Sequence, residues 1–293
     1  MRIYLAGRIT GNCKAYWDAF MKLYLAGTYS TDYCVKEAMK LYLAGNYPGN
    51  RGKGDFSEVA RRPQELYILE SFYYIRDATW VSKMIPLFKG FMLDSGAFTF
   101  IAGKDGSKVD WERYLDEYSE YINQHRIETF LELDIDCVVG LKEVERLRKR
   151  LEKRTGKQPI IAWHDNRGKD YFIQTCKDYK YNAIGTTRAT KQGGVFRGNP
   201  DILRWFIDTA HSFGSKIHGL GYTNLEGMRE YQFDSVDSTA WLYGNRSGII
   251  FIFDGKTLQK RKCPPGKRLK SRAAAIHNFN EWVKYQKYAE AFL

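Results

Sequence analysis

Short apolar runs alternate with amphipathic segments from about residue 67 to the end of the chain. Segments 111–125 and 142–154 repeat apolar residues three and four positions apart, which predicts helices, and Asn199-Pro200 is typical of a further helix start. Strand–helix alternation of this kind indicates a parallel sheet with covered faces. The runs expected to form its strands are 67–69, 91–93, 129–133, 159–163, 182–185, 216–220, 233–236 and 249–253.

Both a doubly wound sheet and a closed barrel satisfy this alternation, and the polar residues distinguish them. Six of the runs end in polar clusters, which begin at residues 94, 134, 164, 186, 219 and 237. The loops after the strands of a barrel share one mouth, whereas an open sheet concentrates such groups at one switch point. The pattern therefore favours an α/β fold of the (β/α)8 TIM-type barrel class.

The first 66 residues differ from the rest. Tyr-Leu-Ala-Gly occurs three times, at 4–7, 24–27 and 42–45, and a Gly-rich polar stretch follows at 46–66. We read the copies as short strand-and-turn pieces. The expected organisation is an N-terminal elaboration, residues 1–66, packed on a barrel formed by residues 67–293, which ends in a basic loop and a helix.

Composition and charge restrict the class of protein. The 293 residues include 46 Lys and Arg against 34 Asp and Glu, and 44% are apolar, which is typical of a basic globular protein. No run of eighteen apolar residues and no secretory signal is present, so we expect no membrane contact. The five cysteines are far apart, which predicts reduced thiols in a cytoplasmic protein and no structural metal site.

The surplus of positive charge is concentrated near the C-terminus. Segment 256–272 contains eight Lys and Arg and no acidic residue, with a rigid Cys-Pro-Pro-Gly in its middle. Such a loop is suited to contact with phosphate groups, although a solvated tail is the simpler alternative. The expected nucleic-acid contacts are Lys260, Arg261, Lys262, Lys267, Arg268, Lys270 and Arg272.

Acidic residues alternate with apolar ones in Leu-Glu-Leu-Asp-Ile-Asp, which would place Glu132, Asp134 and Asp136 on one strand face. In a parallel barrel that face is expected to lie in the interior or at the mouth. Burying three carboxylates costs too much free energy unless hydrogen-bond donors, or a cation such as Mg²⁺, bind to them. We therefore interpret these residues as functional.

Two more acidic positions follow apolar runs. Asp94 lies at the tip of an expected strand, where it is either a reactive carboxylate or the N-cap of the next turn. Asp234 and Asp237 differ by an odd number, so in a regular strand they face opposite sides, and only one of them points into the mouth.

Four motifs in this order resemble those of the tRNA-guanine transglycosylase superfamily. They are Leu-Asp-Ser-Gly-Ala-Phe at 93–98, Glu-Leu-Asp-Ile-Asp at 132–136, His-Gly-Leu-Gly at 218–221 and Phe-Asp-Ser-Val-Asp-Ser at 233–238. The resemblance covers about residues 67–255 and is closest to the phage and bacterial 7-deazaguanine DNA transglycosylases.

The resemblance implies base exchange by double displacement on a (β/α)8 barrel. Asp237 resembles the nucleophile that attacks C1′ of the target nucleotide, with Asp234 as the alternative, and Asp94 resembles the general acid and base. Asp134 or Asp136 resembles the carboxylate that binds the base. The full set of expected base contacts is Asp134, Asp136, Ser95, Gly96, His218, Gly219, Leu220 and Gly221.

Two departures from the family favour DNA over tRNA. The Cys-rich zinc site of the tRNA enzymes cannot be formed by Cys263 alone, and segment 239–244 stands where the bacterial tRNA enzymes have Pro-Thr-Arg. The resemblance implies a pentosyltransferase that needs no redox cofactor and replaces guanine in DNA by a 7-deazaguanine such as preQ0. Exchange in tRNA and a non-catalytic nucleic-acid-binding barrel remain alternatives.

The expected assembly is a monomer or a homodimer. An accessory protein that opens the duplex is a further possible partner, since a base inside a duplex must be extruded before it can react. If the chain is encoded by a phage, the host cytoplasm is the expected location.

Overall fold

The computed structural model describes residues 2–6, 23–26, 64, 67–77, 85–88, 90–97, 99–100, 108–185, 200–222, 224–238, 240, 248–262 and 271–293. These residues form a mixed α/β fold around a nine-stranded sheet whose neighbouring strands all pair in parallel. Its strands are β1 (Arg2–Ala6), β2 (Leu23–Ala26), β3 (Tyr67–Ser71), β4 (Gly90–Asp94), β5 (Thr129–Phe130), β6 (Ile161–Trp163), β7 (Tyr181–Gly185), β8 (Lys216–Leu220) and β9 (Ser235–Ser238).

The strands lie in the order β5-β4-β3-β2-β1-β9-β8-β7-β6, with an additional pairing of β1 and β3. The two strands at the ends of this order are connected by a parallel bridge between Leu131 and Ile160. Glu132 N donates to Ile160 O at 3.0 Å, and Ile160 N donates to Phe130 O at 2.7 Å. The residues that follow β5 are thus hydrogen-bonded to those that precede β6.

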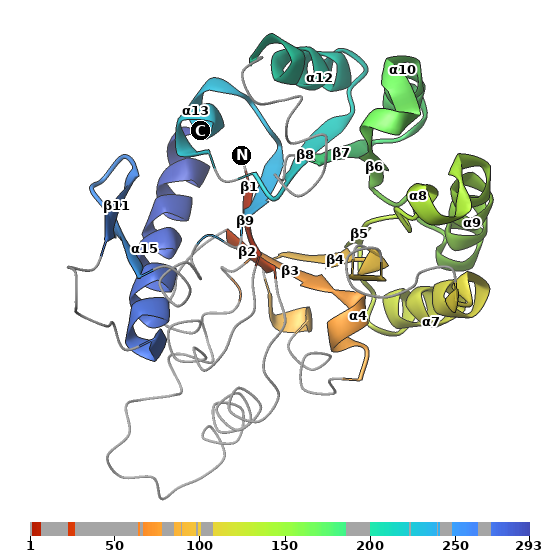
Figure 1. Cartoon of the computed structure of the whole chain (residues 1–293), viewed down its shortest axis with the longest axis horizontal. Coiled ribbons are helices and arrows are strands. Elements are labelled where there is room, and N and C mark those ends of the chain that lie inside the picture. Colours follow the sequence, from red (N-terminus) through yellow and green to blue (C-terminus); the bar gives the residue numbers. More distant parts are fainter. Residues whose placement is uncertain are drawn as a thin grey trace, which may run out of the picture.

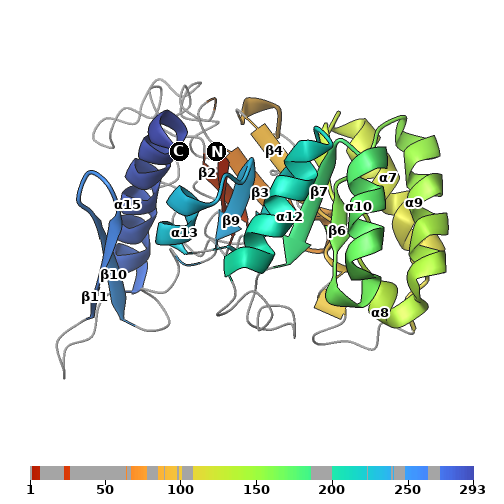
Figure 2. The same cartoon turned by 90° about the horizontal axis from the view of Figure 1, so that it is seen from above.

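Helices surround the strands, as Figures 1 and 2 show. The predicted helix at 111–125 is confirmed as α7, which Asp110 caps by accepting a hydrogen bond from Arg113 N at 3.0 Å. The helices are α4 (Phe72–Ile75), α7 (Trp111–Gln124), α8 (Asp136–Val139), α9 (Leu141–Thr155), α10 (Gly168–Asp178), α12 (Pro200–Ser212), α13 (Leu225–Glu230) and α15 (Ser271–Phe292), with short 3-10 turns η2 (Ile85–Leu87) and η4 (Asp165–Arg167).

Alternation along the strands divides the core into two hydrophobic clusters. On β4, Phe91 and Leu93 belong to the larger cluster, which the covering helices share, whereas Met92 between them belongs to the smaller one. The smaller cluster draws on strands that are far apart in the order of the sheet. Its members are Tyr67, Leu69, Met92, Leu131, Ile160, Ala162 and Ala183.

The last predicted strand does not join the parallel sheet. Residues 249–253 form β10 (Ile249–Phe253), which pairs antiparallel with β11 (Leu258–Lys262) in a separate two-stranded sheet. The connection is short, and Asp254 Oδ1 closes it by accepting hydrogen bonds from Lys256 N and Thr257 N. Such a connection makes a hairpin, because a parallel neighbour needs a long crossover. The strand predicted at 249–253 is therefore confirmed, but its expected place in the parallel sheet was wrong, and part of the expected basic loop is the strand β11.

The N-terminal segment contributes to the parallel sheet itself. The first two Tyr-Leu-Ala-Gly copies overlap β1 and β2, while the third lies outside the described residues. Since β1 pairs with β9 as well as with β2 and β3, residue 66 does not separate two sheets. Whether residues 1–66 form an elaboration on a barrel stays a prediction.

Two general expectations can be compared with the described part of the chain. Cys137 and Cys176, the cysteines within it, are free thiols. Among the helices of that part, none is both long and apolar enough to cross a membrane.

Candidate functional site

Three carboxylates that the sequence singled out lie close together at the carboxyl ends of the strands. Asp94 ends β4, Asp134 follows β5, and Asp237 lies near the end of β9. The negative charges of Asp134 and Asp237 both act on Asp94. The parallel sheet therefore brings together side chains that are up to 143 positions apart in the sequence (94 to 237).

Asp94 has two other carboxylates, Asp134 and Asp237, as neighbours. Its Oδ2 accepts from Gly96 N at 3.1 Å. Burial, together with the charges of Asp134 and Asp237, raises the pKa of Asp94 to about 7 even though the Gly96 amide opposes the shift. Near neutral pH this carboxyl group can both give and take a proton.

The residues after Asp94 orient carboxylates, although the sequence predicted them as base contacts. Gly96 has a φ of +78°, and a Cβ at this position would lie 2.5 Å from the Cβ of Tyr73, so only glycine fits. Ser95 Oγ donates to Asp134 Oδ1 at 3.2 Å. Contact of Ser95 and Gly96 with a base stays a prediction.

Asp134 also lies beside a histidine that sequence reasoning did not select. His164 Nε2, just after β6, is 3.5 Å from Asp134 Oδ2. Burial disfavours the charged imidazole, but the hydrogen bond and charge of Asp134 outweigh burial and raise the pKa of His164. The polar cluster at residue 164 was the sequence signal for this neighbour.

Asp237 has two polar neighbours at a single oxygen, a backbone amide and an imidazole. Gly221 N donates to Asp237 Oδ1 at 2.6 Å, and His218 Nε2 lies 3.3 Å from the same atom. Gly221 reaches this position with a φ of +64°, which favours glycine. His218 is completely buried next to Asp237. It therefore contacts the predicted nucleophile, whereas its expected contact with the base stays untested.

The other two residues of the Gly-Leu-Gly turn serve packing in the described structure. A Cβ on Gly219 would lie 3.0 Å from Tyr222 Cβ and 3.2 Å from Val236 Cγ1, so a larger residue would push β8 away from its neighbours. Leu220 packs against the smaller hydrophobic cluster. Their expected contact with a base stays a prediction.

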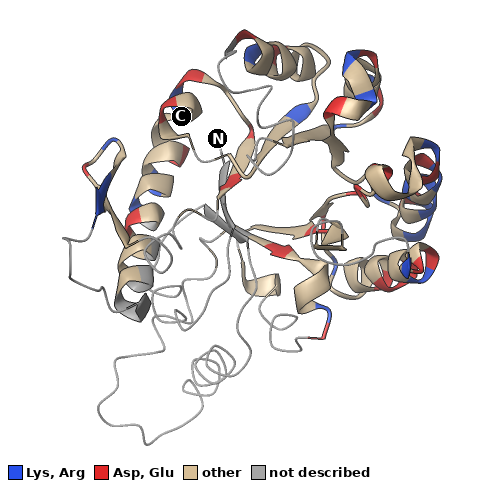
Figure 3. Cartoon of the chain, in the orientation of Figure 1, with Lys and Arg blue, Asp and Glu red and all other residues tan. Residues whose placement is uncertain are grey.

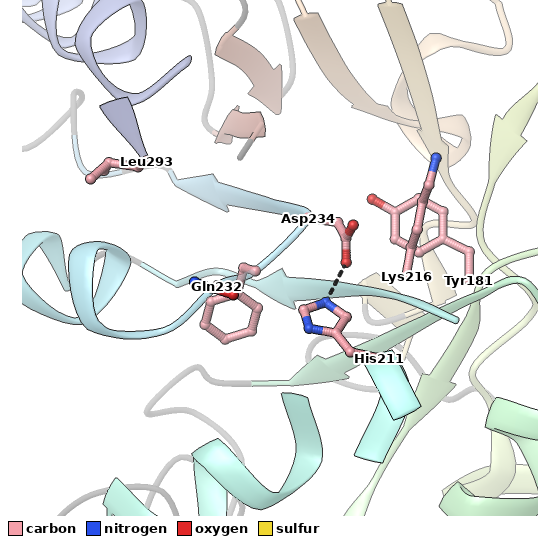
Figure 4. Close-up of a pocket in the computed structure, with 7 residues that line it drawn as sticks. Tyr181, His211, Lys216, Gln232, Asp234 and Leu293 are labelled. Atoms are coloured by element: carbon pink, nitrogen blue, oxygen red, sulfur yellow. Dashed lines mark hydrogen bonds and ion pairs between the residues drawn. The ribbon is translucent and has the colours of Figure 1, made fainter. Parts of the chain in front are cut away.

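Asp234 lies at the opposite end of β9 from Asp237. Its Oδ2 accepts a hydrogen bond from Ile217 N at 2.8 Å and is 3.0 Å from His211 Nε2. It lines a pocket of about 390 Å³, shown in Figure 4, together with Tyr181, His211, Lys216, Gln232, Phe233 and Leu293. The two rival nucleophiles thus lie at opposite ends of one strand, and only Asp237 shares its end with Asp94.

Glu132 and Asp136 form a buried ion network. Glu132 accepts hydrogen bonds from Arg148 Nε at 2.6 Å and from Arg167 Nη1 at 2.7 Å. Arg167 Nη2 also donates to Asp136 at 2.8 Å, and Asn166 Nδ2 donates to the other Asp136 oxygen at 2.6 Å. Burial would raise the pKa of Asp136, but Arg167 and Asn166 lower it.

The expectation that three acidic residues share one strand face was wrong. Strand β5 ends at Phe130, Asp136 begins helix α8, and Glu132 points toward Arg148 of α9 on the helix side of the sheet. Asp136 is paired with Arg167 and Asn166 in the buried network, whereas Asp134 lies beside Asp94, so Asp134 is the better candidate for binding a base.

Arg148 had a recognisable sequence signal. It follows Val144 by four positions and precedes Leu151 by three, so it occupies the apolar face of α9. An arginine on such a face needs a buried acidic partner. Helix 142–154 was interpreted from its sequence only as an amphipathic basic helix, so this signal was missed.

The predicted nucleic-acid contacts are only partly within the described structure. Lys260, Arg261 and Lys262 are exposed on β11, where Figure 3 shows basic residues together. Arg272 lies in helix α15. Lys267, Arg268 and Lys270 lie outside the described residues.

No group of three or more His, Cys, Asp and Glu residues within the described ranges is arranged to hold a metal ion. No protein-family model matches the chain, and no curated protein matches its sequence.

The ion network predicts a large loss of stability when one partner is removed. Arg167→Met leaves Glu132 and Asp136 with fewer donors, and we expect the free energy of unfolding to fall by about 3–5 kcal/mol because a buried charge is left uncompensated. Urea titration of the full chain measures this loss of unfolding free energy. Arg146→Met, which changes an exposed arginine of α9, is the control and should have little effect. Equal losses in both variants would contradict the assignment.

The raised pKa of Asp94 predicts a pH-dependent gain in stability when the carboxyl group is removed. The folded state holds this proton up to about pH 7, whereas an unfolded aspartate releases it near its ordinary pKa of 3.8. The proton that Asp94 keeps in the folded state therefore stabilises the protein at low pH, and this stabilisation is lost as the pH rises through about 7.

Asp94→Asn should consequently gain about 1–3 kcal/mol of unfolding free energy, relative to wild type, between about pH 5 and pH 8. The control Asp208→Asn changes an exposed carboxyl group of α12 and should follow the wild type. An Asp94→Asn curve parallel to that of the wild type would show that the pKa is not raised.

Proposed function

We propose that this protein is a base-exchange glycosyltransferase that replaces guanine in DNA by a 7-deazaguanine base such as preQ0. The observation that carries the proposal is the pairing of unlike carboxyl groups at one end of the sheet. Asp94, with a pKa of about 7, can hold a proton, while Asp237 Oδ1 is held by Gly221 N and lies beside His218 Nε2. The order of the four motifs supports guanine as the base.

We also propose a (β/α)8 barrel as the closed form of the sheet. The bridge between Leu131 and Ile160 supports closure, because it connects the two ends of the strand order. The smaller hydrophobic cluster, which combines residues from β3 to β7, supports it as well. β1 and the seven strands β3 to β9 would supply the eight strands, since β1 pairs directly with β3 and β9. The proposed barrel therefore takes one strand from the first 66 residues and differs in this from the expected boundary at residue 66.

In the first half of the proposed reaction, a carboxylate oxygen of Asp237 forms a bond to C1′ while the bond from C1′ to the guanine nitrogen breaks. The electron pair of the broken bond leaves with guanine, and the proton of Asp94 neutralises it. In the second half, Asp94 takes a proton from the incoming base, whose nitrogen attacks C1′. The aspartyl ester breaks and Asp237 becomes a carboxylate again. No oxidant or reductant is consumed.

Asp134 is suited to select the base in this scheme. It lies beside Asp94, Ser95 Oγ donates a hydrogen bond to one of its oxygens, and His164 Nε2 is 3.5 Å from the other. Guanine and 7-deazaguanines present adjacent N–H donors, which a carboxylate can accept in pairs. A base that lacks these donors would leave a carboxylate unpaired and would be rejected.

The proposal predicts exchange of labelled base into a polymer. Full-length protein incubated with labelled guanine or preQ0 should incorporate it into duplex DNA and not into tRNA. Incorporation into tRNA alone would favour the tRNA alternative. Salt-sensitive binding without incorporation into either polymer would favour the non-catalytic barrel.

Variants of the two rival nucleophiles test the roles of the residues. In the absence of an incoming base, Asp237→Asn should form no covalent adduct with labelled DNA on a denaturing gel, yet it should fold and bind DNA. Asp234→Asn should form the adduct and lose stability, because it supports Ile217 and His211. Asp94→Asn should slow exchange about 10²–10⁴-fold. An adduct formed by Asp237→Asn would reverse the assignment.

Strand β11 predicts a charge-dependent contribution to polymer binding. Replacing Lys260, Arg261 and Lys262 by Gln should weaken DNA binding for all sequences alike and reduce the salt slope of log K by about one for each phosphate that the protein no longer neutralises. The control replaces Lys142, Lys149 and Lys153, three exposed lysines of α9, and so removes the same charge. Equal effects of both triple variants would show that net charge alone matters.

A further inference from the structure

A chain of hydrogen bonds crosses the inner part of the sheet and ends at Asp237. It begins at the Tyr181 hydroxyl, which contacts Ser235 Oγ. Ser235 Oγ lies 2.5 Å from His218 Nδ1, and His218 Nε2 lies 3.3 Å from Asp237 Oδ1. Ser235 and His218 are both completely buried. Three neighbouring strands, β7, β8 and β9, therefore contribute side chains to one polar path.

The two ends of this path lie at opposite ends of the strands. Tyr181 starts β7 and lines the pocket that also contains Asp234 and His211 (Figure 4). Asp237 lies at the end of the sheet where Asp94 is found. In the pairing of β8 with β9, His218 is directly opposite Ser235, so the strand register itself places the imidazole between Ser235 and Asp237.

The number of available protons gives the path a direction. An ionised Asp237 only accepts, so His218 must carry its proton on Nε2 to donate to it. A neutral imidazole then has an acceptor at Nδ1, which Ser235 fills by donating its single proton. Ser235 Oγ in turn accepts from the Tyr181 hydroxyl. Each group therefore donates its one proton to the next group toward Asp237, so every hydrogen bond of the path has its own proton.

We infer that His218 is a positioning residue for the nucleophile, and that Ser235 and Tyr181 hold its imidazole in the neutral Nε2–H form. This inference rests on the proposed function of Asp237. Gly221 N and His218 both meet Oδ1, so within the described residues this oxygen is the anchored one and Oδ2 is the atom presented for attack on C1′. A carboxylate anchored through one oxygen approaches C1′ in one orientation, and loss of such orientation slows a reaction steeply.

The tautomer of His218 can be measured without any substrate. Two-bond ¹⁵N–¹H correlation spectra of the labelled full chain distinguish Nε2–H from Nδ1–H imidazoles, and the signal of His218 among the five histidines is the one that disappears in His218→Gln. The expected result is a neutral Nε2–H form for His218 that becomes a mixture in Ser235→Ala. A His218 protonated at Nδ1 in the wild type would overturn the inference.

Kinetics of adduct formation test the consequence for reaction. His218→Ala should slow formation of the DNA adduct about 10²-fold, Ser235→Ala about 10-fold, and neither should change DNA affinity. His218→Gln, whose amide can still donate to Asp237, should recover part of the rate, which a purely structural role of the imidazole would not predict. The matched control is His211→Ala, because His211 pairs with Asp234 in the same way at the other end of β9.

The outcomes separate this inference from the proposed function. A wild type that forms no adduct with DNA or tRNA contradicts the proposed function, while the tautomer measurement still decides how His218 is held. A wild type that forms the adduct, together with His218 variants that react at its rate, contradicts the positioning role alone. Thermal unfolding of each variant ensures that slow reaction is not caused by misfolding.

Discussion

A carboxyl group can be buried only where neighbouring groups compensate its negative charge or where it keeps its proton. This constraint determines what each acidic residue of the sheet can do. Glu132 and Asp136 are met by guanidinium groups and become part of the scaffold. Asp237 is met by a backbone amide and lies beside an imidazole. Asp94 has other carboxylates as neighbours and consequently tends to keep its proton. The difference lies in their neighbours, since all four residues have the same type of charge.

The alternation of apolar runs with helical patterns allowed much of the fold to be predicted from the sequence. The helices α7 and α9 lie where these patterns predicted them, and strands β3 to β9 overlap the predicted runs, although β5 ends at Phe130 and β9 begins only at Ser235. The failures concern connections. Segment 249–253 has the composition of a buried strand, but whether a strand joins a parallel sheet depends on the chain after it, and here a tight turn at Asp254 forces a hairpin. The placement of β1 beside β9 is a long-range pairing that no local pattern encodes.

The sequence predicted the acidic residues of the candidate site, but it predicted less well which groups contact them. The rule that polar residues gather at the carboxyl ends of parallel strands selected Asp94, Asp134 and Asp237 correctly as neighbours. It could not separate Asp134 from Glu132, because period-two alternation holds only while the strand continues, and β5 ends at Phe130. Partners such as Arg167 come from another segment and become visible only when the chain is folded.

In the proposed reaction, the environments of the two carboxyl groups favour Asp94 as the acid and Asp237 as the nucleophile. A group that donates a proton to a leaving base must hold that proton near neutral pH, and a pKa of about 7 permits this for Asp94. A nucleophile must instead present an unprotonated oxygen in a defined direction, and the two neighbours of Asp237 Oδ1 supply that direction. Exchanging the two residues' roles would require Asp94 to lose its proton beside two negative charges. The proposed assignment of roles thus rests on the same burial constraint that pairs Arg148 and Arg167 with Glu132.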